Sequence, residues 1–271
     1  AIDWDIAPKQ ALFDRGDDIY EWFADASVNT CYNAVDRHVE QGHGKRVAII
    51  YDSPITGKKS TLTYSELQAH VASLAGALVA QGVEKGDRVV IYMPMVPEAV
   101  EAMLACARIG AIHSVVFGGF ASSELAVRID DCKPKAIIAA SCGVEPSRVV
   151  DYKPLLDGGI EQATHKPDTC IILQRGQKPC ELNPERDIDW YAAQDGVRPA
   201  PCVPVEGNHQ AYILYTPGTP GAPKGRVRPT AGHPGALNGT QKNISNVTQG
   251  QVLEAPPTGG GEGGESGRGR A

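Results

Sequence analysis

The sequence lacks the features that mark several special classes of protein. None of its seven cysteines forms a Cys-x-x-Cys pair, and their number is odd, so the close paired spacing of zinc and redox sites is missing. No run of 18 apolar residues occurs, which argues against a membrane-spanning helix. Residues 1–5 show no basic segment followed by an apolar one, so no secretory signal is visible. Together these absences predict a cytoplasmic protein with reduced, mostly buried thiols.

The charge and composition are those of an ordinary globular chain. Lysine and arginine number 26 against 32 aspartates and glutamates, which gives a net charge of −6. Without an excess of positive charge, the chain lacks the electrostatic footprint of a nucleic-acid-binding domain. With 42% hydrophobic and 21% charged residues, it has enough apolar material for a core. We expect neither nucleic acid nor a membrane as a partner.

Short apolar segments alternate with segments of helical periodicity through the middle of the chain. The predicted strands are residues 47–51, 88–93, 112–117, 135–140, 169–173 and 211–216. Several of them are almost continuously apolar, as strands are when both faces of a sheet are covered. Alternation of such strands with helices predicts an α/β fold, with a mainly parallel sheet and flanking helices.

Local signals mark where three helices begin or end. Thr63 and Glu66 have the spacing of a capping box, in which the hydroxyl and the carboxylate satisfy free backbone donors reciprocally. Pro97 suits the first turn of a second helix, and Gly110 is placed to end it. Ser122 is expected to cap a third helix that follows the Gly118–Gly119 turn.

The pattern weakens toward the end of the sequence. Pro234, Gly235 and Gly239 interrupt what would otherwise be a helix over residues 230–243. Seven glycines fall within residues 254–271, where alanine is the only apolar residue besides proline, so we expect this tail to be disordered. We therefore divide the chain into an N-terminal segment (1–62), a main domain (63–253) and a tail (254–271).

The strongest chemical signal is the segment YILYTPGTPGAPKG at residues 212–225. An apolar strand leads into a loop that is rich in glycine and carries two threonine hydroxyls and one lysine. Phosphate groups require backbone N–H donors, close approach and positive charge, which such loops provide. The segment is not a Walker A loop, because Gly225 and not serine or threonine follows Lys224. On spacing alone, a glycine- and proline-rich surface turn remains an equal alternative.

The same segment resembles the phosphate-binding signature of AMP-forming acyl-CoA synthetases, Tyr-Thr-Ser-Gly-Thr-Thr-Gly-x-Pro-Lys-Gly. GDRVVIYMPMVPEAVEAMLACARIGAIHSVVFGGF at residues 86–120 resembles the acetyl- and propionyl-CoA synthetase branch of that family. NTCYNAVDRHVE at 29–40 and EPSRVVDYKPLLD at 145–157 resemble the propionyl type in particular. The resemblance extends over roughly residues 1–250, and it implies an incomplete adenylate-forming N-terminal domain, truncated relative to the family.

The resemblance implies a ligase that works in two steps. A short-chain carboxylate attacks the α-phosphate of ATP, with Mg²⁺, to give an acyl-adenylate and pyrophosphate. The thiol of coenzyme A then displaces AMP and forms the acyl-CoA. The family's catalytic lysine and its magnesium-binding acidic residue lie downstream of the matched segment, so the resemblance assigns neither a catalytic residue nor a metal ligand here.

Two groups of site residues follow from the family's pattern. The residues expected to hold the ATP phosphates are Thr216, Gly218, Thr219, Gly221 and Lys224. The residues expected to contact coenzyme A are Phe117, Gly118, Gly119 and Arg148. A fixed guanidinium suits contact with a phosphate. Without the resemblance, the sequence favours an ordinary strand-to-helix turn for Phe117 to Gly119 and a solvated surface charge for Arg148.

The loop departs from the family's signature at two positions. Pro217 stands where the family has serine, and Pro220 where it has threonine. Each proline removes a hydroxyl and a backbone N–H, which are the donors that a phosphate-binding loop uses. We therefore expect weak nucleotide binding and no acyl-CoA formation by this chain.

A second hypothesis remains open besides a function as a ligase. The chain could be a non-catalytic remnant that binds coenzyme A or a partner chain. A truncated sheet edge exposes apolar surface and unpaired backbone groups, which predicts self-association. A different adenylate-forming enzyme, such as an aryl ligase, is a third option, against which the resemblance of residues 29–40 argues.

Overall fold

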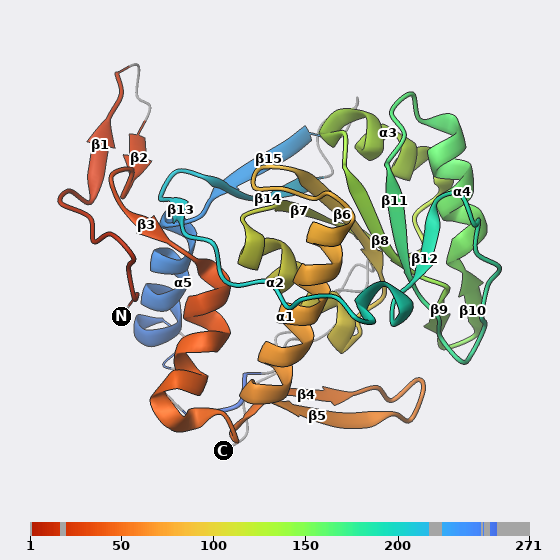
Figure 1. Cartoon of the computed structure of the whole chain (residues 1–271), viewed down its shortest axis with the longest axis horizontal. Helices are drawn as coiled ribbons and strands as arrows, with labels where there is room; N and C mark the ends of the chain where they lie inside the picture. Colours follow the sequence, from red (N-terminus) through yellow and green to blue (C-terminus); the bar gives the residue numbers. More distant parts are fainter. Residues whose placement is uncertain (1, 17–19, 217–223, 245, 247–249, 254–271) are drawn as a thin grey trace.

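A seven-stranded sheet forms the centre of the chain (Figure 1). The computed structural model describes residues 2–16, 20–216, 224–244, 246 and 250–253. In spatial order the strands are β12 (Asp187–Asp189), β11 (Thr169–Leu173), β8 (Ala136–Ala140), β6 (Arg88–Met93), β7 (Ile112–Phe117), β14 (Gln210–Thr216) and β15 (Lys224–Pro229).

Neighbouring strands of this sheet are parallel, with the exception of the β14–β15 pair at one edge. Every residue of β8 and β11 is buried, as expected for parallel strands covered on both faces. The α/β fold and the mainly parallel sheet are thus confirmed.

Four helices flank the sheet. They are α1 (Tyr64–Ala80), α2 (Pro97–Ile109), α3 (Ser122–Cys132) and α4 (Tyr152–Gln162). Strands β7 and β8 lie on opposite sides of β6, so right-handed crossovers carry α2 and α3 to opposite faces of the sheet. Helix α1 packs on α2, and α3 packs on α4.

The sequence signals for α1 and α2 are confirmed in detail. The Thr63 N–H donates to Glu66 Oε2 at 2.8 Å, and the Glu66 N–H donates to Thr63 Oγ1 at 3.3 Å, which completes the capping box. Pro97 is in the first turn of α2, and Gly110 follows its last residue with φ 73°, a left-handed conformation that glycine adopts without strain.

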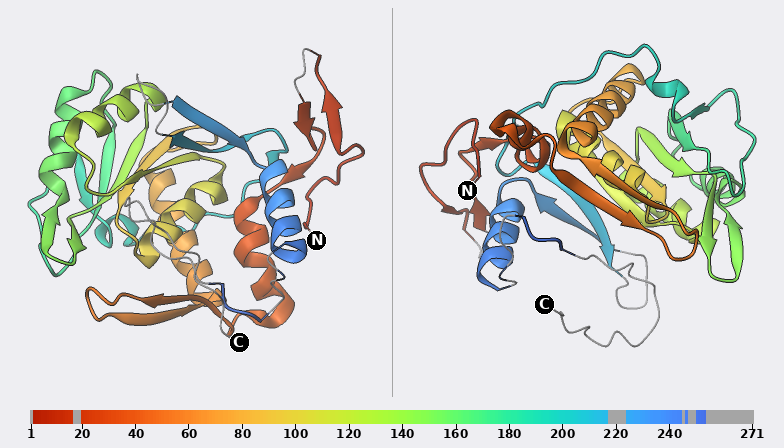
Figure 2. Two further views of the ribbon diagram at one scale, coloured as in Figure 1. Left: turned by 180° about the vertical axis from the view of Figure 1, so that it is seen from behind. Right: turned by 90° about the horizontal axis from the view of Figure 1, so that it is seen from below.

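Smaller elements surround this core. A π-wound helix, η1 (Tyr32–Asp36) and η2 (Val39–His43), precedes the hairpin of β4 (Val47–Asp52) and β5 (Lys59–Thr63), which projects beyond α1 (Figure 2). The other short elements are β1 (Leu12–Asp14), β2 (Tyr20–Trp22), β3 (Ser27–Val28), β9 (Cys142–Glu145), β10 (Arg148–Asp151), η3 (Ala192–Gln194) and β13 (Val205–Glu206). Strand β3 pairs with β13, which ties the N-terminal segment to the connector before β14.

Two local predictions are wrong. Ser122 does not cap α3, since its Oγ donates instead to the Leu155 carbonyl of α4 at 3.0 Å. A helix, α5 (Gly232–Asn243), forms in spite of Pro234 because that proline lies in the first turn, where its missing N–H has no helical partner. Helix α5 lies beside the N-terminal segments, at the end of the molecule away from α4 (Figures 1 and 2).

Near β7 and β14, one face of the sheet is not covered by any of the described residues. Val115 and Phe117 of β7 are 40% and 52% exposed, and Leu214 of β14 is 46% exposed. Leu214 is opposite Arg226 of β15 in the ladder, so a row of basic side chains borders this apolar surface. None of the described helices is both long and apolar enough to cross a bilayer.

Candidate functional site

The carboxyl ends of β7 and β14 bring the two predicted sites together. His113 of β7 is paired with Tyr212 of β14, and the two strands are parallel. Counting four residues forward on each strand places Phe117 and Thr216 at the same level, at the carboxyl edge of the sheet. Ligands of open α/β sheets bind outside this edge. The candidate site is therefore this edge, defined by Thr216, Lys224 and the Phe117–Phe120 turn.

Both described ends of the predicted phosphate loop are at this edge. Thr216 ends β14 and is directly opposite Lys224, the first residue of β15. The Lys224 side chain is exposed. The other predicted loop residues, Gly218, Thr219 and Gly221, lie outside the described residues.

The Phe117–Phe120 turn is held by a tyrosine that the sequence analysis did not single out. Tyr92 Oη donates to the Phe120 carbonyl at 2.8 Å and accepts the Gly119 N–H at 3.1 Å. Burial raises the pKa of Tyr92 to about 12, so its hydroxyl stays protonated and able to donate. Gly119 has φ 99°, a conformation that few other residues adopt. A hydroxyl within an otherwise apolar strand was the signal available in the sequence, because a buried hydroxyl requires a partner.

A second tyrosine, Tyr152 at the start of α4, packs between this turn and the β9–β10 hairpin. A Cβ atom added at Gly118 or at Gly143 would overlap the Tyr152 ring. Both glycines are therefore required for close packing on that ring. Tyr152 also lies against Tyr92, with ring centroids 5.2 Å apart. The two coenzyme A segments named from the sequence are thus linked through Tyr152.

Arg148, the remaining predicted coenzyme A contact, is on β10. Its side chain is exposed, and its Nε donates to Glu145 Oε2 at 2.8 Å across the hairpin. The structure places Arg148 on the hairpin that packs on Tyr152, with its guanidinium engaged by a neighbouring carboxylate. A phosphate ligand would have to compete with Glu145 for that guanidinium.

Lys153 lies in the same segment, but its side chain is buried and forms ion pairs with two carboxylates. It is 8% exposed, and its Nζ is 2.9 Å from Asp187 Oδ2 and 2.5 Å from Asp157 Oδ2. Arg186 also contacts both carboxylates. This network joins α4 to β12, so Lys153 has a structural role in the buried packing of this segment.

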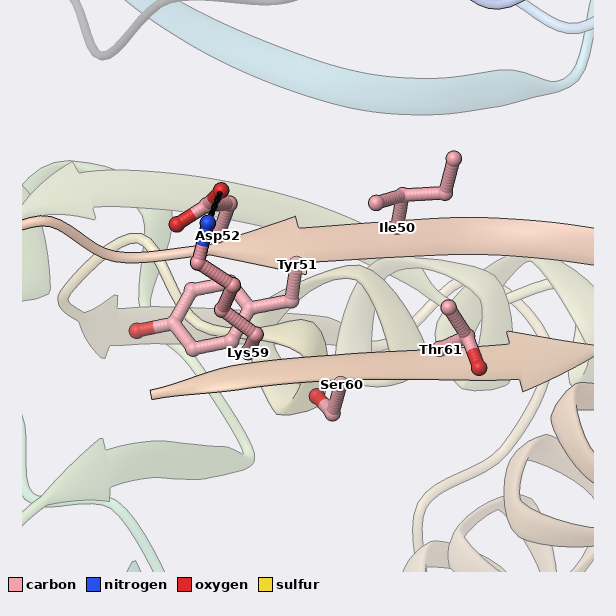
Figure 3. A pocket seen from close by; sticks show the side chains of 6 residues that line it. All are labelled: Ile50, Tyr51, Asp52, Lys59, Ser60 and Thr61. Atoms are coloured by element: carbon pink, nitrogen blue, oxygen red, sulfur yellow. Dashed lines mark hydrogen bonds and ion pairs between the residues drawn. The ribbon is translucent and has the colours of Figure 1, made fainter. Parts of the chain in front are cut away.

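Two pockets are found among the described residues, and neither is lined by a site residue predicted from the sequence. The first, of 420 Å³, is lined only by the β4–β5 hairpin, where Asp52 and Lys59 point toward one another and pair at 2.6 Å (Figure 3). The second, of 190 Å³, lies beyond the ends of β6 and β11, between Pro97, Arg175 and Tyr191. The second pocket shares the carboxyl edge of the sheet with the candidate site.

Comparison with known proteins identifies the family. The family model described as AMP-binding enzyme matches residues 35–249. The chain belongs to the AMP-binding enzyme family. This confirms the family resemblance found in the sequence.

Similar proteins carry the names of short-chain acyl-CoA synthetases. The rat protein "Acyl-CoA synthetase short-chain family member 3, mitochondrial" is 50% identical over 252 residues, which are 93% of this chain and 37% of the rat protein. The human protein of the same name is 48% identical with the same coverage. "Propionate--CoA ligase" of Escherichia coli is 40% identical over 255 residues, 93% of this chain and 40% of that enzyme. The chain thus spans well under half the length of these AMP-binding relatives.

Replacing Gly118 with alanine tests the packing at the Phe117–Phe120 turn. Because the added methyl group would overlap Tyr152, either that ring or the turn has to shift. We expect the G118A variant to lose about 1–3 kcal/mol of unfolding free energy, the usual cost of overpacking, as measured by urea denaturation. Gly176→Ala is the matched control, since nothing lies within 4 Å of the added atom. Equal stability of the two variants would contradict the packing described.

Proposed function

We propose that the chain forms the N-terminal part of the adenylation domain of an AMP-forming short-chain acyl-CoA synthetase. The observation that carries this proposal is the meeting of Thr216, Lys224 and the Phe117–Phe120 turn at one carboxyl edge of a parallel sheet. The names of the rat and Escherichia coli relatives support it, because both are those of acyl-CoA-forming ligases.

The proposed roles follow from the chemistry of each group. Thr216 and Lys224 flank the loop that would hold the ATP phosphates, where a hydroxyl, backbone donors and a cation offset negative charge on the departing pyrophosphate. Mg²⁺ would accompany ATP. Coenzyme A would lie against the Gly118–Gly119 turn, with Arg148 near one of its phosphates.

The complete reaction joins a carboxylate such as propionate to coenzyme A. The carboxylate attacks the α-phosphate of ATP and releases pyrophosphate, and the thiol then displaces AMP from the acyl-adenylate. We expect no turnover by this chain alone, because Pro217 and Pro220 remove loop donors and the chain matches only 37–40% of the length of its relatives. A pyrophosphate-release assay with ATP, Mg²⁺, propionate and coenzyme A measures this. Sustained release would contradict the expectation.

Restoring the loop tests the proposed ATP site directly. In the double variant P217S/P220T, each substitution returns a hydroxyl and a backbone N–H. We expect Mg-ATP to bind at least ~10-fold more tightly than to the parent chain, since one charge-assisted hydrogen bond contributes about 1.5–3 kcal/mol. Isothermal titration calorimetry provides the measurement. Pro201→Ser, at an exposed connector position, is the matched control and should change nothing. An unchanged affinity in the double variant would remove the ATP site from the proposal.

A non-catalytic role is the second candidate, and the uncovered sheet face favours it. Val115, Phe117 and Leu214 are exposed, and within the described residues no strand pairs with the outer side of β15. Such an edge and face can accept another chain or a second copy of this one. Size-exclusion chromatography at increasing concentration, with and without coenzyme A, separates the alternatives. If the chain stays monomeric at all concentrations and its elution does not change with coenzyme A, the result would count against this role.

The cytoplasmic location expected from the sequence remains a prediction. The name of the rat relative places that protein in mitochondria.

A further inference from the structure

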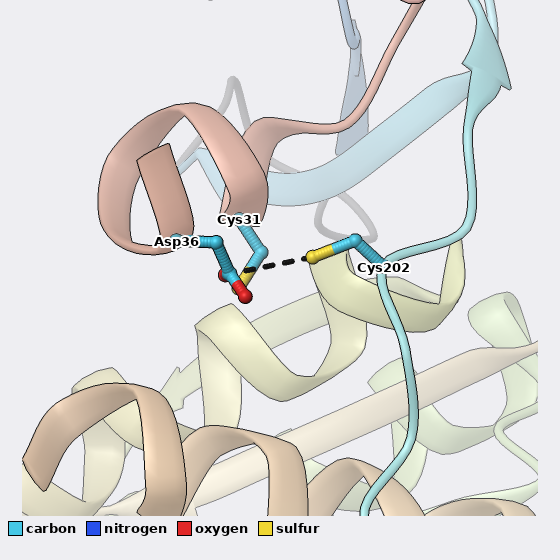
Figure 4. Close-up of side chains that lie close together, drawn as sticks. All are labelled: Cys31, Asp36 and Cys202. Carbon is cyan, nitrogen blue, oxygen red and sulfur yellow. Dashed lines mark hydrogen bonds between the residues drawn. The ribbon is translucent and has the colours of Figure 1, made fainter. Parts of the chain in front are cut away.

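Two cysteines from distant parts of the chain meet at one buried carboxylate. Cys31 lies just before η1, and Cys202 lies in the connector between η3 and β13 (Figure 4). The two Sγ atoms and an Asp36 carboxylate oxygen all lie within 4.8 Å of one another. The Cys202 thiol is 3.5 Å and the Cys31 thiol 3.9 Å from the same oxygen, Asp36 Oδ2. This is the one group of at least three potential metal ligands that the described part of the chain brings this close.

The surrounding structure holds both cysteines in place. On one side of Cys202, the Ala200 carbonyl accepts from Arg108 Nε at 2.6 Å. On the other side, the Val203 N–H donates to the Arg108 carbonyl at 2.8 Å, and the Val203 carbonyl accepts from Asn29 Nδ2 at 2.8 Å. Asn29 thus ties the segment next to Cys31 to the segment next to Cys202. The fold therefore holds the two thiols close together, although they are far apart in the sequence.

A metal ion fits this cluster poorly. Arg108 donates to both Asp36 oxygens, at 2.8 and 3.0 Å, and its Nη1 is 3.6 Å from Cys31 Sγ. A divalent cation bound by Cys31, Asp36 and Cys202 would therefore sit beside a buried guanidinium. Gln68 also donates to Asp36 at 2.8 Å, so the carboxylate has few free lone pairs. The charge of Arg108 favours a reaction between the thiols over coordination of a cation.

We propose that Cys31 and Cys202 are a thiol pair that a peroxide oxidises to a disulfide. The half-buried Cys202 reacts first: its sulfur attacks one peroxide oxygen, the O–O bond breaks, and sulfenic acid and water (or an alcohol) form. Cys31 sulfur then attacks Cys202 sulfur and displaces the hydroxyl group, which leaves as water. Two S–H bonds are lost and one S–S bond forms, while the peroxide gains two electrons. A thiol reductant reverses the change.

The neighbours of the pair set the rate of this reaction. The hydrogen bond with Cys31 is the largest of the causes that raise the pKa of Cys202, followed by burial. The charged groups that face the pair are Asp36, which raises this pKa further, and Arg108, which lowers it. Thiolate is therefore scarce at neutral pH, and thiolate is the reacting form. We expect oxidation at pH 9 to be at least several-fold faster than at pH 7.

The disulfide would join the N-terminal helix to the connector and close a long loop. Such a cross-link restricts the unfolded chain, so we expect Tm to rise by about 5–10 °C on oxidation and to fall again with dithiothreitol. Four other cysteines are buried, and among the described residues none of them belongs to such a group of at least three potential ligands; they are Cys106, Cys132, Cys142 and Cys170.

The test uses the full chain treated with hydrogen peroxide and then blocked with N-ethylmaleimide. Non-reducing peptide mapping by mass spectrometry should yield one cross-linked pair, the peptides of Cys31 and Cys202, lighter by two hydrogen atoms. Cys202→Ser and Cys202→Ala should abolish both the cross-link and the rise in Tm. Cys180→Ser, which removes the other half-buried thiol, should retain both. Alkylation of Cys31 and Cys202 after oxidation, a different cross-link, or a retained zinc ion in native mass spectrometry would overturn the proposal.

Discussion

Replacing Arg108 with methionine is expected to destabilise the chain by about 3–5 kcal/mol, the cost of leaving a buried charge without its partner. Arg108 and Asp36 are each 8% exposed at the side chain and form two hydrogen bonds. Burial by itself would raise the pKa of Asp36, but hydrogen bonds from Arg108 and Gln68 hold it below its ordinary value. Removal of Arg108 takes away the larger part of that compensation.

Urea denaturation at pH 7 measures this effect, and two further variants show its cause. The variant Lys59→Met removes an ion pair of similar length between two exposed side chains, Asp52 and Lys59. We expect it to lower the free energy of unfolding by no more than about 1 kcal/mol. The double variant D36L/R108M leaves no buried charge, so it should recover much of the lost stability. If R108M lowered the free energy of unfolding as little as K59M does, the buried Arg108–Asp36 pair would not stabilise the fold as the structure indicates.

His113 is expected to make the fold sensitive to acid between pH 6.5 and 4. It lies in β7 with its ring stacked on Tyr212, and its Nδ1 is buried without a hydrogen-bond partner among the described residues. Burial lowers the pKa of His113 from 6.5 to about 4. As the pH falls, the unfolded chain therefore binds a proton near pH 6.5, whereas the folded chain does not bind it until about pH 4. The free energy of unfolding thus decreases as the pH falls through this window.

The variant H113F keeps a ring for Tyr212 to stack on but has nothing to protonate. We expect it to lose about 2 kcal/mol less unfolding free energy than the parent chain between pH 7 and pH 4, a figure reduced because His113 as a whole is half-buried. Urea denaturation at a series of pH values gives the comparison. His43→Gln removes a histidine from the end of η2 and serves as the control. Parallel pH profiles for H113F and the parent chain would show that His113 does not carry this sensitivity.

The sequence predicted the centre of the fold well because its signals are local there. The limits of β6, β7 and β11 coincide with their short apolar runs, and the capping box starts α1 where expected. Helix α4 was missed because Gly158 and Gly159 argue against a helix. In the structure they allow α4 to approach Ser122 and Leu125 of α3 closely, which is tertiary information.

The site was predictable only in part. The glycine-rich loop and the Gly118–Gly119 turn are visible as sequence patterns, and strand pairing brings their described parts to one edge. The sequence shows that the buried Tyr92 hydroxyl needs a partner, but it does not show that Tyr92 and Tyr152 contact this turn, because both contacts join residues that are distant in the sequence. The exposed edge strand β15 was also missed, since KGRVRP is too polar to resemble a strand.

Backbone chemical-shift mapping tests the central claim most directly. The isotope-labelled chain is titrated with Mg-ATP and, separately, with coenzyme A at millimolar concentrations, where even weak binding shifts amide resonances. We expect ATP to perturb the amides around Thr216 and Lys224, and coenzyme A those around Gly118 and Arg148. Perturbations confined to the β4–β5 hairpin, or none at saturating concentrations of either ligand, would contradict a nucleotide site at the carboxyl edge of the sheet.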